Sequence, residues 1–148
     1  MSNFFDIIGH KNNLDLLYKS AINNKILNAY LFYGEKGVGK YTIAKKYAKL
    51  LNCLNKTDDF CDECVVCYQI NNNIFPDVYI IQPTPENIVI EGMENIVKNK
   101  DDLIKPIKKQ IVVDDIDKLS KQFSYKKYNS RYRIGIIDES DKMNINAA

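Results

Sequence analysis

The sequence feature that most constrains this chain is a glycine-rich segment at residues 34–40, GEKGVGK, which fits the G-x-x-x-x-G-K pattern of a phosphate-binding loop. Glycines let successive backbone N–H groups turn inward around a phosphate, and the lysine adds a full positive charge. The apolar run at residues 29–33 predicts a buried strand before the loop. Apolar side chains on one face of residues 42–51 predict a helix after it, whose positive dipole end would favour an anion.

Tyr41 departs from this pattern, because the residue after the lysine is normally Ser or Thr and its hydroxyl binds Mg²⁺. A phenol ring cannot replace a short hydroxyl without moving the loop, and Thr42 lies about 100° further around the helix. Backbone amides and Lys40 can still hold ATP or ADP, but efficient Mg²⁺-dependent hydrolysis is not expected. A glycine turn without a ligand is the alternative. The candidate nucleotide-binding residues are Gly34, Glu35, Lys36, Gly37, Val38, Gly39, Lys40, Tyr41 and Thr42.

An acidic pair, Asp138 and Glu139, follows a predicted strand at residues 134–137. An aspartate at the end of a strand beside a phosphate loop can hold Mg²⁺, and a neighbouring glutamate can orient an attacking water. Taken alone, the pair would be interpreted as a surface cap of the strand. Because a phosphate-loop pattern lies upstream, we interpret Asp138 and Glu139 as degenerate Walker B candidates, and we assign no confident catalytic residue.

All four cysteines of the chain fall within one short segment, with the spacing C-x7-C-x2-C-x2-C. Two-residue gaps let neighbouring thiolates converge on one ion, which suits tetrahedral Zn²⁺ in a closed, structural site. Four free thiols are one alternative. An iron–sulfur cluster is another, which the absence of a Cys-Pro signature and the polar surroundings disfavour. The candidate metal ligands are Cys53, Cys61, Cys64 and Cys67.

Charge and hydropathy exclude several classes of protein. The chain has 21 basic and 19 acidic residues, a net charge of +2, so strong DNA binding by this chain alone is not expected. No apolar run approaches the roughly 18 residues that span a bilayer, and the first residues lack the pattern of a signal peptide. We therefore expect a cytoplasmic protein without membrane contact, in a compartment that keeps thiols reduced.

The order of predicted elements indicates an α/β fold with a parallel sheet flanked by helices. Helices are predicted at residues 14–22, 42–51, 68–72 and 116–123, and strands at 29–33, 77–81 and 133–138, with a short apolar run at 111–113 and an extended segment at 88–90. Asn144 is a predicted N-cap, so a helix should begin near Ile145. We therefore expect residues 1–148 to be the N-terminal portion of a module that is incomplete at its C-terminus, with a zinc-binding insert at about 53–67 and a divergent insertion at about 84–110.

These motifs occur together in a narrow pattern that resembles bacterial clamp-loader subunits of the AAA+ class. The segments that carry the resemblance are residues 5–10, FDIIGH, residues 28–34, NAYLFYG, the four cysteines, residues 75–77, FPD, and residues 136–144, IIDESDKMN. The delta-prime subunits of the DNA polymerase III holoenzyme are the more similar type. The gamma/tau subunits carry a hydroxyl residue after the loop lysine, and their acidic strand runs Asp-Glu-Val-His.

The resemblance implies a stator-like subunit that contributes interfaces, within a machine that uses ATP to load a sliding clamp onto primed DNA. Its implied partners are other clamp-loader subunits, of the gamma/tau and delta types, and indirectly the sliding clamp and primed DNA. In this family such a subunit can lend an arginine from a Ser-Arg-Cys motif to the ATP site of a neighbour. The resemblance implies that this motif lies beyond Ala148, and Arg131 and Arg133 are not assigned that role. Two alternatives stay open: a catalytically active gamma/tau-type ATPase subunit, and a zinc-containing nucleotide kinase.

Overall fold

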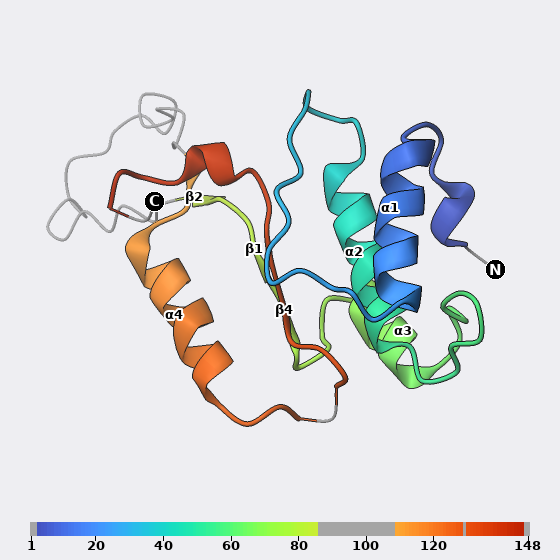
Figure 1. Cartoon of the computed structure of the whole chain (residues 1–148). Helices are drawn as coiled ribbons and strands as arrows, with labels where there is room; N and C mark the ends of the chain where they lie inside the picture. The colour runs from blue at the N-terminus through green and yellow to red at the C-terminus, as the bar shows by residue number, and fades with distance from the viewer. Residues whose placement is uncertain (1–2, 86–108, 129, 147–148) are drawn as a thin grey trace, which may run out of the picture. The chain divides into compact units, whose positions relative to one another are not determined.

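The computed structural model describes residues 3–85, 109–128 and 130–146 (Figure 1). The chain divides into two compact units. The first unit comprises Met1–Ile80 with Phe123–Ile136, and the second comprises Ile81–Gln122 with Ile137–Ala148. None of the helices in the described residues is long and apolar enough to cross a bilayer.

Three α-helices and a short 3-10 helix build the first unit. They are η1 (Phe4–Asp6), α1 (Lys11–Ile22), α2 (Lys40–Asn52) and α3 (Val65–Asn71). The predicted helices at 14–22, 42–51 and 68–72 are therefore confirmed, each with an earlier start. Helix α1 buries Leu14, Leu17 and Ala21, the face that the 3.6-residue period predicted. Helix α2 contacts both α1 and α3 and buries side chains against each core cluster, so it is the central element of this unit.

The prediction of a buried strand at residues 29–33 is wrong for the part of the chain that the structure describes. The segment is extended but has no assigned strand partner there. Tyr30 and Phe32 pack against the core, whereas Leu31 and Tyr33 are 80% and 90% exposed. An extended segment becomes a strand only when a neighbour satisfies its backbone N–H and C=O groups. The side chains of this segment therefore alternate between buried and exposed positions as in a strand, but in the described residues no neighbouring strand pairs with its backbone.

The strands predicted near residues 77–81 and 133–138 are confirmed as β1 (Val78–Ile81) and β4 (Ile134–Ile137), which are neighbours in a two-stranded sheet. The Ile134 N–H donates to the Asp77 carbonyl at 2.9 Å, and the Asp138 N–H donates to the Ile81 carbonyl at 2.9 Å. Since both partners advance in the same chain direction, the strands are parallel.

A buried carboxylate secures the chain leading into β4. Asp77 is 1% exposed and accepts the Tyr128 N–H at 2.9 Å. The Arg133 guanidinium lies 3.5 Å from Asp77 and donates to the Phe123 carbonyl at 2.8 Å. Its side chain is only 8% exposed. Arg133 therefore has a structural role within this unit.

The second unit contains β2 (Thr84–Pro85), which pairs antiparallel with β3 (Lys109–Gln110), and the 3-10 helix η3 (Ser140–Lys142). Helix α4 (Val113–Ser124) begins three residues earlier than predicted. Ile111, which belongs to the short apolar run at 111–113, is fully buried and forms a parallel bridge with Met143. Residues 145 and 146 form a turn where a helix was predicted. The extended segment at 88–90 and most of the 84–110 insertion lie outside the described residues.

Candidate metal centre and glycine loop

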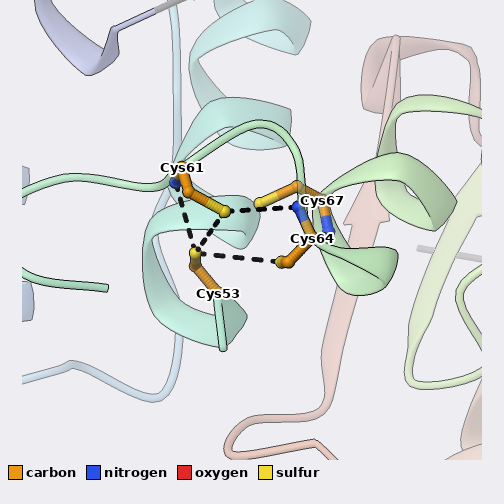
Figure 2. Close-up of side chains that lie close together, drawn as sticks. All are labelled: Cys53, Cys61, Cys64 and Cys67. Atoms are coloured by element: carbon orange, nitrogen blue, oxygen red, sulfur yellow. Dashed lines mark hydrogen bonds between the residues drawn. The ribbon is translucent and has the colours of Figure 1, made fainter. Parts of the chain in front are cut away.

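The four cysteine sulfurs converge on one point in the first unit (Figure 2). All four Sγ atoms lie within 4.8 Å of one another. Cys53 Sγ is 3.5 Å from Cys61 Sγ and 4.0 Å from Cys64 Sγ. A tetrahedral ion with metal–sulfur bonds near 2.3 Å needs sulfurs about 3.8 Å apart. The cluster therefore has the dimensions of a four-thiolate metal centre, and the predicted ligand set is brought together in full.

Secondary structure explains why the sulfurs meet. Cys53 is the C-cap of α2, and Cys64 is the N-cap of α3, with Cys67 one turn further along that helix. The remaining ligand, Cys61, lies in the connection between the helices. Asp62 follows it with a φ of +59°, and this left-handed residue turns the chain so that two ligands face the same point. The ends of two packed helices therefore hold three of the ligands.

Backbone N–H groups point at the sulfurs. Cys61 N donates to Cys53 Sγ at 3.3 Å, Cys64 N to Cys61 Sγ at 3.3 Å, and Cys67 N to Cys64 Sγ at 3.5 Å. Burial raises the pKa of the Cys64 thiol, but hydrogen bonding with the backbone of Cys67 and Leu54 and with the thiols of Cys67 and Cys61 together lowers the pKa to about 6. Burial raises the pKa of the Cys67 thiol. Because a metal binds the thiolate, N–H groups aimed at the sulfurs favour the form of the cysteines that binds a metal ion.

Two cations flank the cluster. Lys56 and Arg131 line a polar cavity of about 260 Å³ that also includes Cys53. Burial lowers the pKa of Lys56, and the positive charge of Arg131 lowers it further. A divalent ion bound by four thiolates carries a net charge of −2, so nearby cations would offset part of that charge.

The predicted phosphate loop occupies the turn before α2, but an extended segment precedes it instead of a paired strand. Gly37 and Gly39 have φ values of +87° and +91°, which L side chains rarely adopt. The Lys40 ammonium folds back onto the loop and donates to the Gly34 carbonyl at 2.9 Å and the Glu35 carbonyl at 2.7 Å. The structure therefore gives Lys40 partners within the loop, and phosphate binding by residues 34–42 stays a prediction.

The loop borders an open cleft of about 540 Å³, in which Thr42 is a lining residue and Tyr41 is not. Tyr41 instead packs against the core cluster that contains Ala48 and Val78, with the Lys45 ammonium 5.8 Å from its ring centroid. The sequence prediction that Tyr41 cannot stand in for a loop hydroxyl is therefore consistent with its position. The other wall of the cleft contains Asp6, Ile7, Ile8 and His10. The sequence analysis assigned no binding role to these residues.

His10 links that wall to the loop, because its Nε2 lies 3.1 Å from the Val38 carbonyl. It has a φ of +56° and is the N-cap of α1 without a side-chain cap. The only sequence signal for this contact was the segment FDIIGH, which contributed to the resemblance but carried no site prediction.

The acidic pair, Asp138 and Glu139, lies in the second unit. The Asp138 carboxylate accepts a hydrogen bond from the Gln82 amide at 3.2 Å, and Glu139 forms an ion pair with Lys142. Glu139 has a φ of +51°. These contacts give both carboxylates local structural partners, and their role as Walker B residues remains a prediction.

Comparison with known proteins identifies the class. The family model described as "DNA polymerase III, delta subunit" matches residues 9–148. DNA polymerase III subunit delta' of Bacillus subtilis is 31% identical over 135 residues, which are 91% of this chain and 34% of that protein. Subunit gamma/tau of Mycoplasma pneumoniae is 32% identical over 112 residues, 76% of this chain and 16% of that protein. Subunit gamma of Buchnera aphidicola is 34% identical over 119 residues, 80% of this chain and 33% of that protein.

Helices with a small parallel sheet and a converging cysteine cluster agree with the clamp-loader class of AAA+ proteins that the sequence resembled. The chain belongs to the DNA polymerase III delta-subunit family. It spans about a third or less of the length of the three relatives described above.

Proposed function

We propose that this chain acts as a delta-prime-like, stator subunit of a DNA polymerase III clamp loader, and that it contributes interfaces rather than ATP turnover. In this role it takes part in ATP-driven loading of a sliding clamp onto primed DNA, together with subunits of the gamma/tau and delta types. The observation that carries the proposal is Tyr41, whose ring packs against the core where an active loop needs a Mg²⁺-binding hydroxyl.

The glycine loop binds ATP or ADP in this proposal. The glycine backbone of residues 34–39, the N-terminus of α2 and the exposed cleft support it. A bound phosphate would compete with the Gly34 and Glu35 carbonyls for the Lys40 ammonium. Without a loop hydroxyl, Mg²⁺ is held weakly and hydrolysis is slow.

The cysteine cluster holds a structural Zn²⁺ in this proposal. Four sulfurs at tetrahedral spacing leave no open position for a substrate or a water, which is the chemistry of a closed site. The ion would join α2 to α3 and order the connection between them. Residues 1–148 then form the N-terminal portion of a AAA+ module, a proposal supported by the short share of each relative that they span.

The test is ATP turnover by the assembled clamp loader containing this subunit as the full-length protein. We expect Lys40→Ala to leave the rate of hydrolysis unchanged and to abolish binding of a fluorescent ATP analogue to the isolated subunit. Lys45→Ala is the matched control, because Lys45 lies on α2 outside the lining of the cleft and its ammonium donates to the Asn71 carbonyl. A large loss of hydrolysis in Lys40→Ala alone would overturn the stator assignment.

An ATPase subunit of the gamma/tau type is the second candidate. Thr42 lines the cleft, which supports a role for its hydroxyl in place of the missing loop hydroxyl. The gamma/tau relative from Mycoplasma pneumoniae is also as similar to this chain as the delta' relative is. Under this candidate, Thr42→Val lowers the rate of ATP hydrolysis, whereas a stator subunit shows no change.

A further inference from the structure

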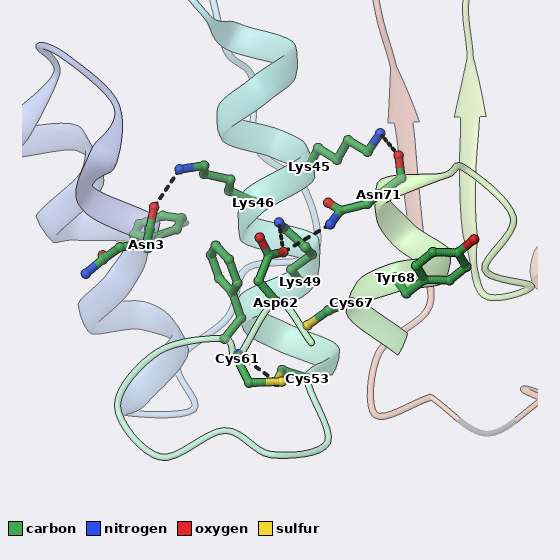
Figure 3. Close-up of polar contacts among 12 residues, drawn as sticks. Asn3, Lys45, Lys46, Lys49, Cys53, Cys61, Asp62, Cys67, Tyr68 and Asn71 are labelled. Atoms are coloured by element: carbon green, nitrogen blue, oxygen red, sulfur yellow. Dashed lines mark hydrogen bonds and ion pairs between the residues drawn. The ribbon is translucent and has the colours of Figure 1, made fainter. Parts of the chain in front are cut away.

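The carboxylate of Asp62 lies at the junction of the two helices that carry the cysteine ligands (Figure 3). Lys49 Nζ on α2 is 2.5 Å from Asp62 Oδ1, and the Asn71 side-chain amide on α3 donates to the same oxygen at 3.0 Å. Asp62 itself belongs to the turn between Cys61 and Cys64. One carboxylate oxygen therefore joins α2, α3 and the turn.

The three residues have a regular relation to the ligands. Lys49 lies four residues before Cys53, and Asn71 lies four residues after Cys67, so each is one helical turn from a cysteine. Asp62 also directly follows the ligand Cys61 in the chain. It is therefore joined to one ligand through the backbone, while its side chain holds the two helices that carry the other three.

The charges of this pair are largely removed from water. The Lys49 side chain is 4% exposed and the Asp62 side chain is 19% exposed. The Lys49 ammonium also lies 4.2 Å from the centre of the Phe60 ring, a residue of the same connection. A buried ammonium without a carboxylate partner is costly, so the pair strongly favours the one arrangement of the turn that keeps it intact.

We propose that Asp62, with Lys49 and Asn71, is the positioning device of the cysteine cluster, and that it sets the spacing of the four sulfurs before a metal ion binds. The proposal rests on the metal site proposed above and adds residues that are not ligands. Groups that orient metal ligands typically change metal affinity by about 10–100-fold when removed. The affinity is affected because the free chain otherwise has to order the turn at the moment of binding.

The experiment measures Zn²⁺ affinity of the full chain by competition with a chromophoric chelator, and the ligand field of bound Co²⁺ by its absorption spectrum. We expect Asp62→Asn to weaken Zn²⁺ binding by about 10–100-fold and to alter the Co²⁺ spectrum, with all four thiols still titratable. Glu63→Gln is the matched control, because it removes the same charge from the exposed neighbouring residue of the same turn. The control should bind both ions as the wild type does.

Further variants separate positioning from general stability. Lys49→Met should weaken binding alone but add little in the Asp62→Asn background, since both changes break one interaction. Lys49→Arg keeps the positive charge, so its Zn²⁺ affinity should be closer to that of the wild type than the affinity of Lys49→Met is. Asn71→Ala removes only the bond to α3 and should give a smaller loss without changing helix content.

Two results would overturn the proposal, and they have different meanings. Wild-type affinity and an unchanged Co²⁺ spectrum in Asp62→Asn, or in Asn71→Ala should Asp62→Asn fail to fold, would remove the positioning role and leave the metal site standing. Failure of the wild-type chain to bind either Zn²⁺ or Co²⁺ would remove the metal site itself and the positioning role with it.

Discussion

The cysteine cluster and the glycine loop lie at opposite ends of helix α2, and they differ in how fully their residues are held. The cluster is fixed by two helix ends, by N–H groups aimed at sulfur and by a buried ion pair. The loop is fixed mainly by its own backbone, and its lysine is bonded to its own carbonyls. The cysteine cluster is therefore preorganised, whereas the glycine loop has an ammonium group that a ligand could draw away from the loop carbonyls.

The largest expected effect in this comparison is removal of the metal. Binding of a structural Zn²⁺ contributes on the order of 10 kcal/mol of apparent free energy in small metal sites. We expect excess chelator to lower the thermal midpoint of the chain strongly, measured by circular dichroism with and without added Zn²⁺. Magnesium-free buffer should leave the midpoint unchanged. Identical melting curves with chelator and with Zn²⁺ would contradict a structural role for the cluster.

A smaller effect is expected in the core around α2, the helix that links the two regions. Leu50 of α2 is fully buried, and Leu50→Ala should cost about 2–5 kcal/mol because it leaves a cavity. Leu54→Ala, at a side chain that is 59% exposed, is the control and should cost little. Chemical denaturation followed by thiol reactivity and by a dye in the cleft should give one shared transition. Two separate transitions would show that α2 does not couple the regions.

The smallest effect is expected in the loop alone. Gly39 has a φ of +91°, so Gly39→Ala should cost about 1–2 kcal/mol of local strain, although no atom lies within 4 Å of the added Cβ. Zn²⁺ affinity should stay at the wild-type value, and nucleotide affinity should fall. The measurement is chelator competition beside ATP-analogue binding on one preparation. A matching fall in Zn²⁺ affinity would show that strain at one end of α2 reaches the other.

The sequence predicted the helices and the cysteine cluster well because both depend on local spacing. Leu14, Leu17 and Ala21 share a face in any helix, and two-residue gaps bring thiols together whatever the surroundings. The strand at 29–33 failed for the opposite reason. Its alternating side chains are local, but its pairing depends on a neighbour that the described residues do not provide.

The sequence could not reveal the contacts that support the sites. Lys49 reads as an ordinary helix lysine, and only the packing of α2 against α3 places its ammonium on Asp62. The same holds for His10, whose bond to the Val38 carbonyl joins residues 28 positions apart. Contacts of this kind depend on the tertiary arrangement, so the spacing of residues in the sequence does not predict them.

Helix α2 is a single uninterrupted element of 13 residues, which makes it a rod about 20 Å long. The glycine turn lies before its first residue and Cys53 directly follows its last. A tilt imposed at the phosphate end would therefore appear at the sulfur end as a displacement of comparable size. The position of the glycine turn and the spacing of the thiols are therefore linked through one rigid helix.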